Sequence, residues 1–209
     1  MSIIRDPQYL DENFIPEKMW FRNEHLKVVA KAIEPKLSNS RHKNVLIHGA
    51  SGAGKTSSSK YLLHDLKQHE PQIRTAYIDC WKHWTRFTLL KAIAEELGLN
   101  LIQGKIASNE LLFKIENFAK RYQCVLVIDE IDQLKDRWIL YFFRDFNIAV
   151  VLIAASESLI FHLDDKLRSR LEPLERVHFP TYRSDEIQSI VEIRAHKALR
   201  PGVLNRDQI

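Results

Sequence analysis

Residues 49–56 have the types and the spacing of a loop that binds the phosphates of a nucleotide. They read Gly-Ala-Ser-Gly-Ala-Gly-Lys-Thr and follow a short apolar run. The glycines allow tight turns that aim main-chain N–H groups at a phosphate chain. A helix starting near Lys55 would present its positive N-terminal end to the same anion. We therefore predict that Lys55 contacts the β- and γ-phosphates and that the Thr56 hydroxyl binds Mg²⁺. The predicted nucleotide contacts of this loop are Gly49, Ala50, Ser51, Gly52, Ala53, Gly54, Lys55, Thr56 and Ser57.

A second pattern places two acids where a bound nucleotide needs them. Residues 125–129 form an apolar run that ends in Asp129 and is followed by Glu130. The carboxyl edge of a parallel sheet is where ligands of open α/β folds collect. There Asp129 could hold Mg²⁺, directly or through water, and Glu130 could polarise the water that attacks the γ-phosphate. The alternative for Glu130 is a solvated residue at the head of a loop.

Composition limits the class of protein. The chain has 209 residues, 45% of them hydrophobic and 28% charged, which is typical of one soluble α/β domain. A net charge of +4 is compatible with nucleic acid but does not demonstrate binding to it. Cys80 and Cys124 have no partner in a metal or disulfide pattern, so we expect reduced core thiols and a cytoplasmic protein. The longest apolar run, residues 148–155, is too short to span a membrane, and we expect no membrane association.

Apolar runs alternate with amphipathic segments along the chain. We predict strands near residues 45–48, 75–79, 125–129, 150–155 and 177–179. We predict helices near residues 24–37, 55–69, 87–97, 108–119, 138–143 and 184–199, the fifth of them short and buried. This alternation indicates an α/β fold with a mainly parallel five-stranded sheet flanked by helices.

Short matches spread over nearly the whole chain resemble the archaeal origin-recognition and cell-division-control initiators, which are AAA+ ATPases of DNA replication. They are residues 14–17, 21–24, 44–56, 127–132, 167–173 and 179–182, the last group with the helix that follows it. The resemblance implies an AAA+ three-layer sandwich with a phosphate loop, and Mg²⁺-dependent ATP hydrolysis at low turnover. It also implies roles for single residues. Phe21 and Arg22 would lie against the adenine base, Arg170, near Lys166 and Arg168, would reach the γ-phosphate of a neighbouring subunit, and Ser156 would sense the γ-phosphate.

The sequence departs from that family at the end of the fourth predicted strand. Relatives usually have an asparagine there, whereas this chain reads Ala-Ala-Ser-Glu-Ser over residues 154–158. A glutamate aimed at a γ-phosphate would be repelled, so Ser156 is the better candidate sensor. Slow hydrolysis would follow.

The resemblance also suggests a division of the chain. Residues 1–23 would be an arm that contacts the adenine side, residues 24–202 the ATPase domain, and residues 203–209 the start of a truncated lid. Full-length relatives continue into a helical lid and a winged-helix DNA-binding domain. Without the lid, we expect the nucleotide to be held more loosely.

Two segments raise the question of DNA contacts. Relatives use a helical insertion near residues 98–109, where Gln103, Lys105 and Asn109 could touch DNA, but the segment is short and weakly basic, so we interpret it as a plain loop. The Trp-Lys-His-Trp sequence at residues 81–84 could stack on bases. Aromatic residues that follow a strand usually pack against the core or its rim, and we expect that of Trp81 and Trp84.

The leading interpretation is a switch in DNA replication initiation that binds ATP or ADP, in origin recognition or helicase loading. Its partners would be DNA, further copies of itself, or initiator and helicase subunits. One alternative is a non-catalytic nucleotide-binding module that docks to a full-length initiator or helicase. Another is an AAA+ ATPase that serves a mobile element.

Overall fold

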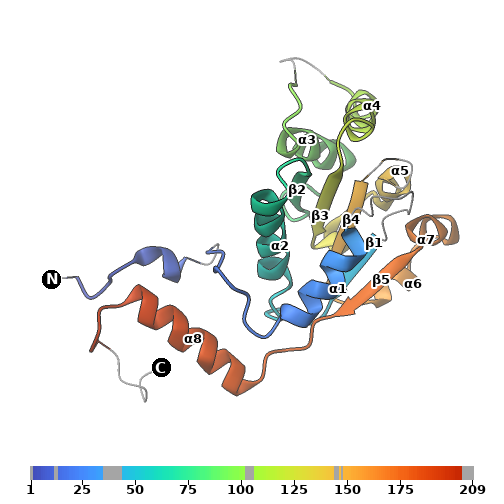
Figure 1. Cartoon of the computed structure of the whole chain (residues 1–209). Helices are drawn as coiled ribbons and strands as arrows, with labels where there is room; N and C mark the ends of the chain where they lie inside the picture. Colours follow the sequence, from blue (N-terminus) through green and yellow to red (C-terminus); the bar gives the residue numbers. More distant parts are fainter. Residues whose placement is uncertain are drawn as a thin grey trace.

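The fold is built around one five-stranded sheet in which every strand pairing is parallel (Figure 1). It is seen in a computed structural model that describes residues 2–11, 14–34, 44–101, 106–143, 146 and 148–203. The order of the strands is β2-β3-β4-β1-β5. Their bounds are Asn44–His48 for β1, Arg74–Asp79 for β2, Cys124–Asp129 for β3, Ile148–Ala154 for β4 and Leu174–His178 for β5. The α/β class and the parallel five-stranded sheet predicted from the sequence are confirmed.

Helices cover both faces of the sheet. On one face lie α1 (Asn23–Ile33) and α2 (Lys55–His69), which pack against β1, β5, β2 and β3. The opposite face is covered by α3 (Arg86–Glu96), α4 (Ser108–Ala119), α5 (Leu140–Phe143), α6 (Ser158–Phe161) and α7 (Asp165–Leu171). Three short 3-10 helices complete the described elements up to β5: η1 (Pro7–Leu10), η2 (Ile131–Gln133) and η3 (Arg137–Ile139).

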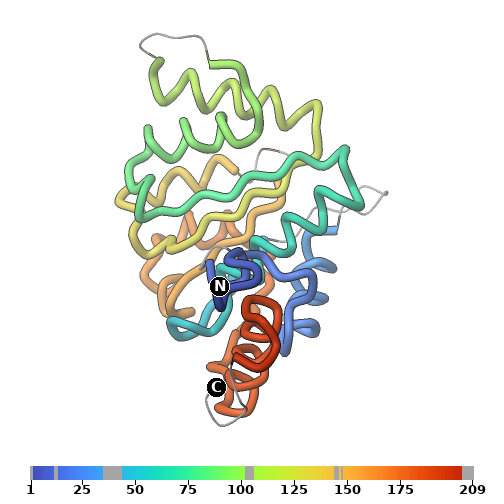
Figure 2. The backbone as a smooth tube through the Cα atoms, turned by 90° about the vertical axis from the view of Figure 1, so that its left-hand side faces the viewer, coloured from blue at the N-terminus to red at the C-terminus, as the bar shows by residue number. Residues whose placement is uncertain are grey.

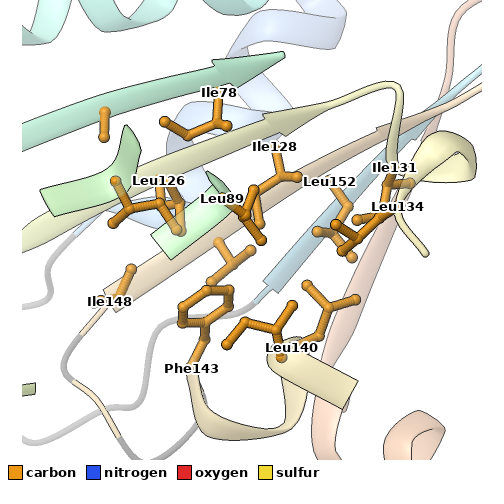
Figure 3. Close-up of a cluster of buried hydrophobic side chains, with 14 of the residues drawn as sticks. Ile78, Leu89, Leu126, Ile128, Ile131, Leu134, Leu140, Phe143, Ile148 and Leu152 are labelled. Carbon is orange, nitrogen blue, oxygen red and sulfur yellow. The ribbon is translucent and has the colours of Figure 1, made fainter. Parts of the chain in front are cut away.

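The central strands are buried on both faces, which explains their uninterrupted aliphatic sequences. Alternate side chains of each strand therefore enter two separate hydrophobic cores. In the larger core, side chains of the sheet meet those of the covering helices (Figure 3), among them Ile78, Leu126, Ile128, Leu152, Leu89, Leu140 and Phe143. Cys80 and Cys124 are buried thiols as predicted, and burial raises the pKa of each to about 12. This packing fixes the carboxyl edge of the sheet, where the candidate site lies.

A last helix, α8 (Ser184–Ala198), lies apart from the layers described so far. It packs against η1 from the start of the chain. Figure 1 shows α8 in red beside the blue N-terminal segment, and Figure 2 shows the same pairing from another side. Main-chain hydrogen bonds from Arg5 and Asp6 to the Ala198 carbonyl join the two segments. The domain boundaries predicted from the sequence remain predictions, and residues 204–209 lie outside the described residues.

Several element boundaries differ from the predictions for physical reasons. The first helix ends at Ile33, just ahead of Pro35, whose ring disfavours a helical residue before it. Strand β5 begins earlier than expected, at Leu174, because an edge strand can hold exposed polar residues that hide its pattern. Residues 138–143 form parts of η3 and α5 rather than one buried helix, and Trp138 is exposed.

Candidate nucleotide-binding site

The phosphate loop connects the end of β1 to the start of α2, as the sequence predicts. At two of its glycines a side chain would collide with neighbouring atoms unless those atoms moved. A Cβ on Gly49 would lie against the Phe179 carbonyl oxygen, and one on Gly54 would lie 2.5 Å from the Tyr182 hydroxyl. Gly54 also has a left-handed conformation, with φ of 82°. At both glycines the loop therefore lies close to the chain that follows β5.

The first turn of α2 has N–H groups that can bind an anion. The helix begins at Lys55, and no side chain of a described residue caps its N-terminus. The N–H groups of a first turn have no partner within the helix, and they carry its positive partial charge. Lys55 itself is buried and donates from Nζ to the Gly49 and Ala50 carbonyls, at 2.7 and 2.9 Å. Its ammonium group is therefore held at the loop itself.

Asp129 connects the loop to β3. Its side chain is 2% exposed, and its Oδ2 accepts hydrogen bonds from Thr56 Oγ1 and from the Tyr77 hydroxyl, both at 2.6 Å. Its Oδ1 accepts from the Glu130 N–H at 2.8 Å. The two residues predicted to bind the metal thus lie in direct contact. A carboxylate and a hydroxyl are the oxygen ligands that Mg²⁺ prefers, so this pair fits the ion.

Glu130 follows Asp129 in an unusual backbone conformation. Its φ of 53° and ψ of 45° are left-handed, which is uncommon for a residue other than glycine. The side chain is half-buried, and burial raises the pKa of its carboxyl above the ordinary value, with a smaller contribution from the Asp129 charge. Lys55 acts on this pKa in the opposite direction, which places Glu130 within electrostatic reach of the loop lysine.

The turn after β4 contains the candidate sensor. Because β4 lies between β3 and β1, this turn emerges between the phosphate loop and the Asp129–Glu130 pair. Ser156 is exposed, and its Oγ accepts the Ser158 N–H at 3.1 Å. Glu157 forms an ion pair with Arg176 at 3.1 Å, and its carboxylate lies 3.9 Å from Nε2 of His48, whose pKa is lowered by burial. The glutamate therefore has a positive partner of its own in Arg176, and Ser156 stays the candidate sensor.

Arg22 lies inside the protein, at the junction of three segments. It is 2% exposed, and its guanidinium carbon lies 3.8 Å from the centre of the Tyr182 ring. Nε donates to the Ala53 carbonyl at 3.0 Å and an Nη donates to the Pro180 carbonyl at 2.6 Å. The predicted adenine contact thus has its donors engaged by the main chain, and the geometry indicates that Arg22 positions the phosphate loop. Its neighbour Phe21 is exposed.

A cavity of about 250 Å³ lies beside the phosphate loop. Its walls come from the N-terminal arm, the loop, the chain after β5 and α8. They include Pro16, Lys18, Met19, Trp20, Gly52, Gly54, Ser57, Tyr182, Ile190, Ile193 and Arg194. The arm therefore flanks this cavity, but Phe21 and Arg22 do not line it, and the contact of the arm with the adenine base stays a prediction. The sequence did not reveal that Tyr182 and α8 line this cavity, because no spacing rule connects these residues to the phosphate loop.

The arginine predicted to act on a neighbouring subunit contacts another element of its own chain. Arg170 stacks on Tyr141 of α5, with 4.1 Å between its guanidinium carbon and the ring centre, and donates to the Tyr141 hydroxyl at 2.7 Å. Arg168 forms an ion pair with Asp165 on the same helix. These contacts neither bring Arg170 to the phosphate loop nor test its proposed action on a second chain.

The two segments considered for DNA contacts have different outcomes. Gln103 and Lys105 lie outside the described residues, and Asn109 accepts a hydrogen bond from Arg86 at 3.2 Å. Trp81 and Trp84 do not pack in the core, because their side chains are 61% and 46% exposed, and the expected packing at its rim stays a prediction. The reason is local: the chain turns outward after β2, where the Trp81 N–H binds the Asp79 side chain.

Comparison with known proteins decides the family. The AAA domain family matches residues 38–161, which is more than half of the chain. This chain belongs to the AAA domain family. The matched residues include the phosphate loop and the Asp129–Glu130 pair, so the AAA domain contains both motifs of the site.

The AAA domain resembles replication proteins of archaea. The whole chain is 29% identical over 206 residues to ORC1-type DNA replication protein 1 of Halobacterium salinarum, covering 97% of this chain and 67% of that protein. It is 27% identical to the protein of that name from Methanothermobacter thermautotrophicus, of which it covers 58%. Among solved structures, the Aeropyrum pernix ORC1 protein in complex with DNA matches with a TM-score of 0.86 and 26% identity, covering 99% of this chain and 58% of that one. The chain thus spans about three fifths to two thirds of these proteins.

The structure of Cdc6p from Pyrobaculum aerophilum has the same fold, with a TM-score of 0.84 at 22% identity. These likenesses confirm the AAA+ three-layer architecture and the resemblance to archaeal initiators predicted from the sequence. No helix within the described residues has both the length and the apolar character that crossing a membrane requires.

Proposed function

We propose that this chain is an ATP-dependent switch that acts in the initiation of DNA replication. The observation that carries the proposal is the contact between Thr56 and Asp129 at the base of the phosphate loop. It brings the two predicted magnesium ligands together beside the lysine and the main-chain N–H groups that would bind phosphates. The likeness to ORC1-type replication proteins supports the place of this switch in replication.

Each residue of the site has a distinct task in the proposed reaction. The N–H groups at the start of α2 and the Lys55 ammonium bind the phosphates. Thr56 and Asp129 would hold Mg²⁺, which would offset the negative charge of the phosphate oxygens. Glu130 accepts a proton from the attacking water, whose oxygen forms a bond to the γ-phosphorus while the bond to the β,γ-bridging oxygen breaks. The products are ADP and phosphate.

Ser156, the cavity and Arg170 would make hydrolysis depend on which nucleotide is bound and on contact with other subunits. Ser156 donates to the γ-phosphate and thereby distinguishes ATP from ADP. The base enters the cavity between the arm and α8, so both of these segments contact the nucleotide. Arg170 reaches the nucleotide of a second copy, which connects hydrolysis to self-association or to docking on initiator and helicase subunits. Slow turnover follows from a serine at the sensor position and suits a switch better than a motor.

Phosphate release from ATP tests the catalytic part of the proposal. It would be measured for the purified protein and for Glu130→Gln, each with and without DNA. We expect turnover in the wild type and at least a tenfold loss in the variant, since general-base catalysis contributes about 10²–10⁴-fold. Equal rates of phosphate release for the two proteins would show that Glu130 does not act in hydrolysis and would rule out the enzyme interpretation.

A second candidate function is a nucleotide-binding module without catalysis, which docks to a full-length initiator or helicase. The observation that favours it is the turn after β4, where Ser156 replaces the usual asparagine and Glu157 is paired with Arg176. This module would bind ATP and ADP with similar affinity and release no phosphate. Calorimetric titration with each nucleotide separates the two functions, because a sensor of the γ-phosphate requires a difference in affinity.

A further inference from the structure

A third acid follows the Asp129–Glu130 pair and contacts the turn that contains the candidate sensor. Asp132 belongs to η2, the 3-10 helix that begins directly after Glu130. Its Oδ2 accepts a hydrogen bond from the Ala155 N–H at 3.0 Å. Ala155 follows the last residue of β4 and precedes Ser156. One side chain therefore joins the segment after β3 to the turn after β4.

The sheet itself does not hold this turn. The register of β4 with β3 ends at Leu152, and its register with β1 ends at Ala154. Ala155 and Ser156 lie beyond both pairings, and both residues are exposed. Exposed main chain with few packed neighbours opens more easily than a paired strand. The hydrogen bond from Asp132 therefore restrains the chain at the residue before the candidate sensor.

Asp132 is itself held in place by its own segment. Ile131, the residue before it, is fully buried where η2 packs against β4 (Figure 3). The Gln133 N–H donates to the Glu130 carbonyl at 2.9 Å, which closes the 3-10 turn. The Asp132 carbonyl accepts a hydrogen bond from an Nη of Arg137 at 3.1 Å. A carboxylate on a segment that is fixed in this way can impose a position on its partner.

The Asp132 carboxylate is not explained by an ion pair. Among the residues that the structure describes, no lysine or arginine lies within ion-pair distance of it, and the Ala155 N–H is its hydrogen-bond donor. A carboxylate accepts a stronger hydrogen bond than a neutral oxygen does. Its charge also raises the pKa of the Glu130 carboxyl, after the larger contributions of burial and Asp129. Asp132 thus lies within electrostatic reach of the proposed general base and in contact with the sensor turn.

We propose that Asp132 is a positioning residue that holds the turn after β4 so that Ser156 can donate to the γ-phosphate. The Ser156 Oγ accepts the Ser158 N–H, which leaves the hydroxyl hydrogen for the phosphate. Without the Asp132 carboxylate, the Ala155 N–H loses its acceptor and the turn relaxes. ATP then loses the contact with Ser156, whereas ADP, which has no γ-phosphate, is bound as before. The inference rests on the proposed sensor function of Ser156 and adds the residue on which that function depends.

Calorimetric titration with ADP and with a non-hydrolysable ATP analogue, both in the presence of Mg²⁺, tests the proposal. The preference for the triphosphate is the dissociation constant of ADP divided by that of the analogue. One hydrogen bond to a charged group corresponds to roughly 10- to 150-fold in affinity. Ser156→Ala should therefore lower this preference at least about tenfold, and Asp132→Ala should lower it by a similar factor. The affinity for ADP should not change in either variant.

Three further variants assign the effect to the contact between Asp132 and Ala155. Asp132→Asn keeps a side-chain oxygen that can accept the Ala155 N–H, so it should retain most of the preference. The double variant Asp132→Ala with Ser156→Ala should lose no more than either single variant, because the two residues act as one unit. The matched control is Asp136→Ala, since Asp136 also accepts a main-chain N–H, that of Trp138 at 3.1 Å, in the next turn of the same segment. It should bind both nucleotides as the wild type does, and circular dichroism verifies the folding of each variant.

Two results would overturn the inference alone. The first is a wild-type preference in Asp132→Ala when Ser156→Ala has lost it, because the sensor would then need no such support. The second is an equal loss of affinity for ADP and for the analogue in Asp132→Ala, which would assign a general structural role to the carboxylate. A wild type without any preference, or an unchanged preference in Ser156→Ala, would instead refute the proposed sensor and the inference with it.

Discussion

Removal of the Arg22 side chain is the substitution whose effect the structure specifies best. Arg22 joins the arm, the phosphate loop and the chain after β5, through the Ala53 and Pro180 carbonyls and the Tyr182 ring. It is almost fully buried. Arg22→Ala would leave the buried Ala53 carbonyl and the partly buried Pro180 carbonyl without their donors and would remove the cation from the aromatic face.

The size of the effect follows from these contacts. A hydrogen bond from a charged donor contributes about 1.5–3 kcal/mol, and a desolvated cation–π contact contributes about 2 kcal/mol. Since such terms overlap and water can enter the space, we expect the free energy of unfolding to fall by about 4 kcal/mol rather than by their sum. That is a large part of the 5–15 kcal/mol typical of a domain. Arg22→Lys keeps the charge but loses the planar fork, so we expect about half the loss.

Urea denaturation followed by circular dichroism measures this change. With a slope of about 2 kcal/mol per molar urea, Arg22→Ala should lower the midpoint by about 2 M. The matched control is Lys27→Ala, because Lys27 forms an exposed ion pair with Glu24 and should leave the midpoint unchanged. A midpoint for Arg22→Ala within error of the control would refute the positioning role.

Two further predictions concern side chains around the site. Tyr77→Phe removes one of the two hydroxyl donors to Asp129 Oδ2, so the free energy of unfolding should fall by about 2 kcal/mol, and the Mg²⁺ dependence of nucleotide binding should weaken by about tenfold. Thermal unfolding and nucleotide titration measure these two changes. Tyr61→Phe on α2 is the control, and equal behaviour of the two variants would contradict the prediction. Burial lowers the pKa of His48 below 6.5, so the folded state disfavours its protonation, and stability present above pH 6.5 should decline as pH falls below it. His48→Gln should show a smaller drop in melting temperature between pH 7.5 and pH 5.5, and an unchanged drop would assign the pH dependence to other groups.

The sequence predicts the parts of this protein that obey local rules. The alternation of aliphatic runs with amphipathic segments predicts the sheet, and the glycine spacing of residues 49–56 predicts the loop and the helix start at Lys55. The sequence also predicts that Asp129 belongs to the site, because a buried strand must end at the ligand-binding edge of a parallel sheet. Its contact with Thr56 follows from the two motifs together.

Other features depend on contacts between distant residues, which no spacing reveals. Arg22 and Tyr182 lie 160 positions apart in sequence, and their stacking decides that Arg22 faces inward. The Tyr77 hydroxyl contacts Asp129 because β2 and β3 are neighbours in the sheet, and the order of strands in a sheet cannot be predicted from local sequence patterns. The exposure of Trp81 and Trp84 depends on a turn capped by Asp79, whereas composition alone favours packing for such residues.

The central claim is that residues 49–56 bind the phosphates of ATP with Mg²⁺ held by Thr56 and Asp129. Calorimetric titration of ATP in the presence of Mg²⁺ tests it most directly, with Lys55→Ala beside the wild type and Lys67→Ala on the same helix as the control. We expect Lys55→Ala to weaken binding at least tenfold, since a charge-assisted hydrogen bond to phosphate contributes about 1.5–3 kcal/mol, while Lys67→Ala binds normally. Unchanged affinity of Lys55→Ala for ATP would contradict the account.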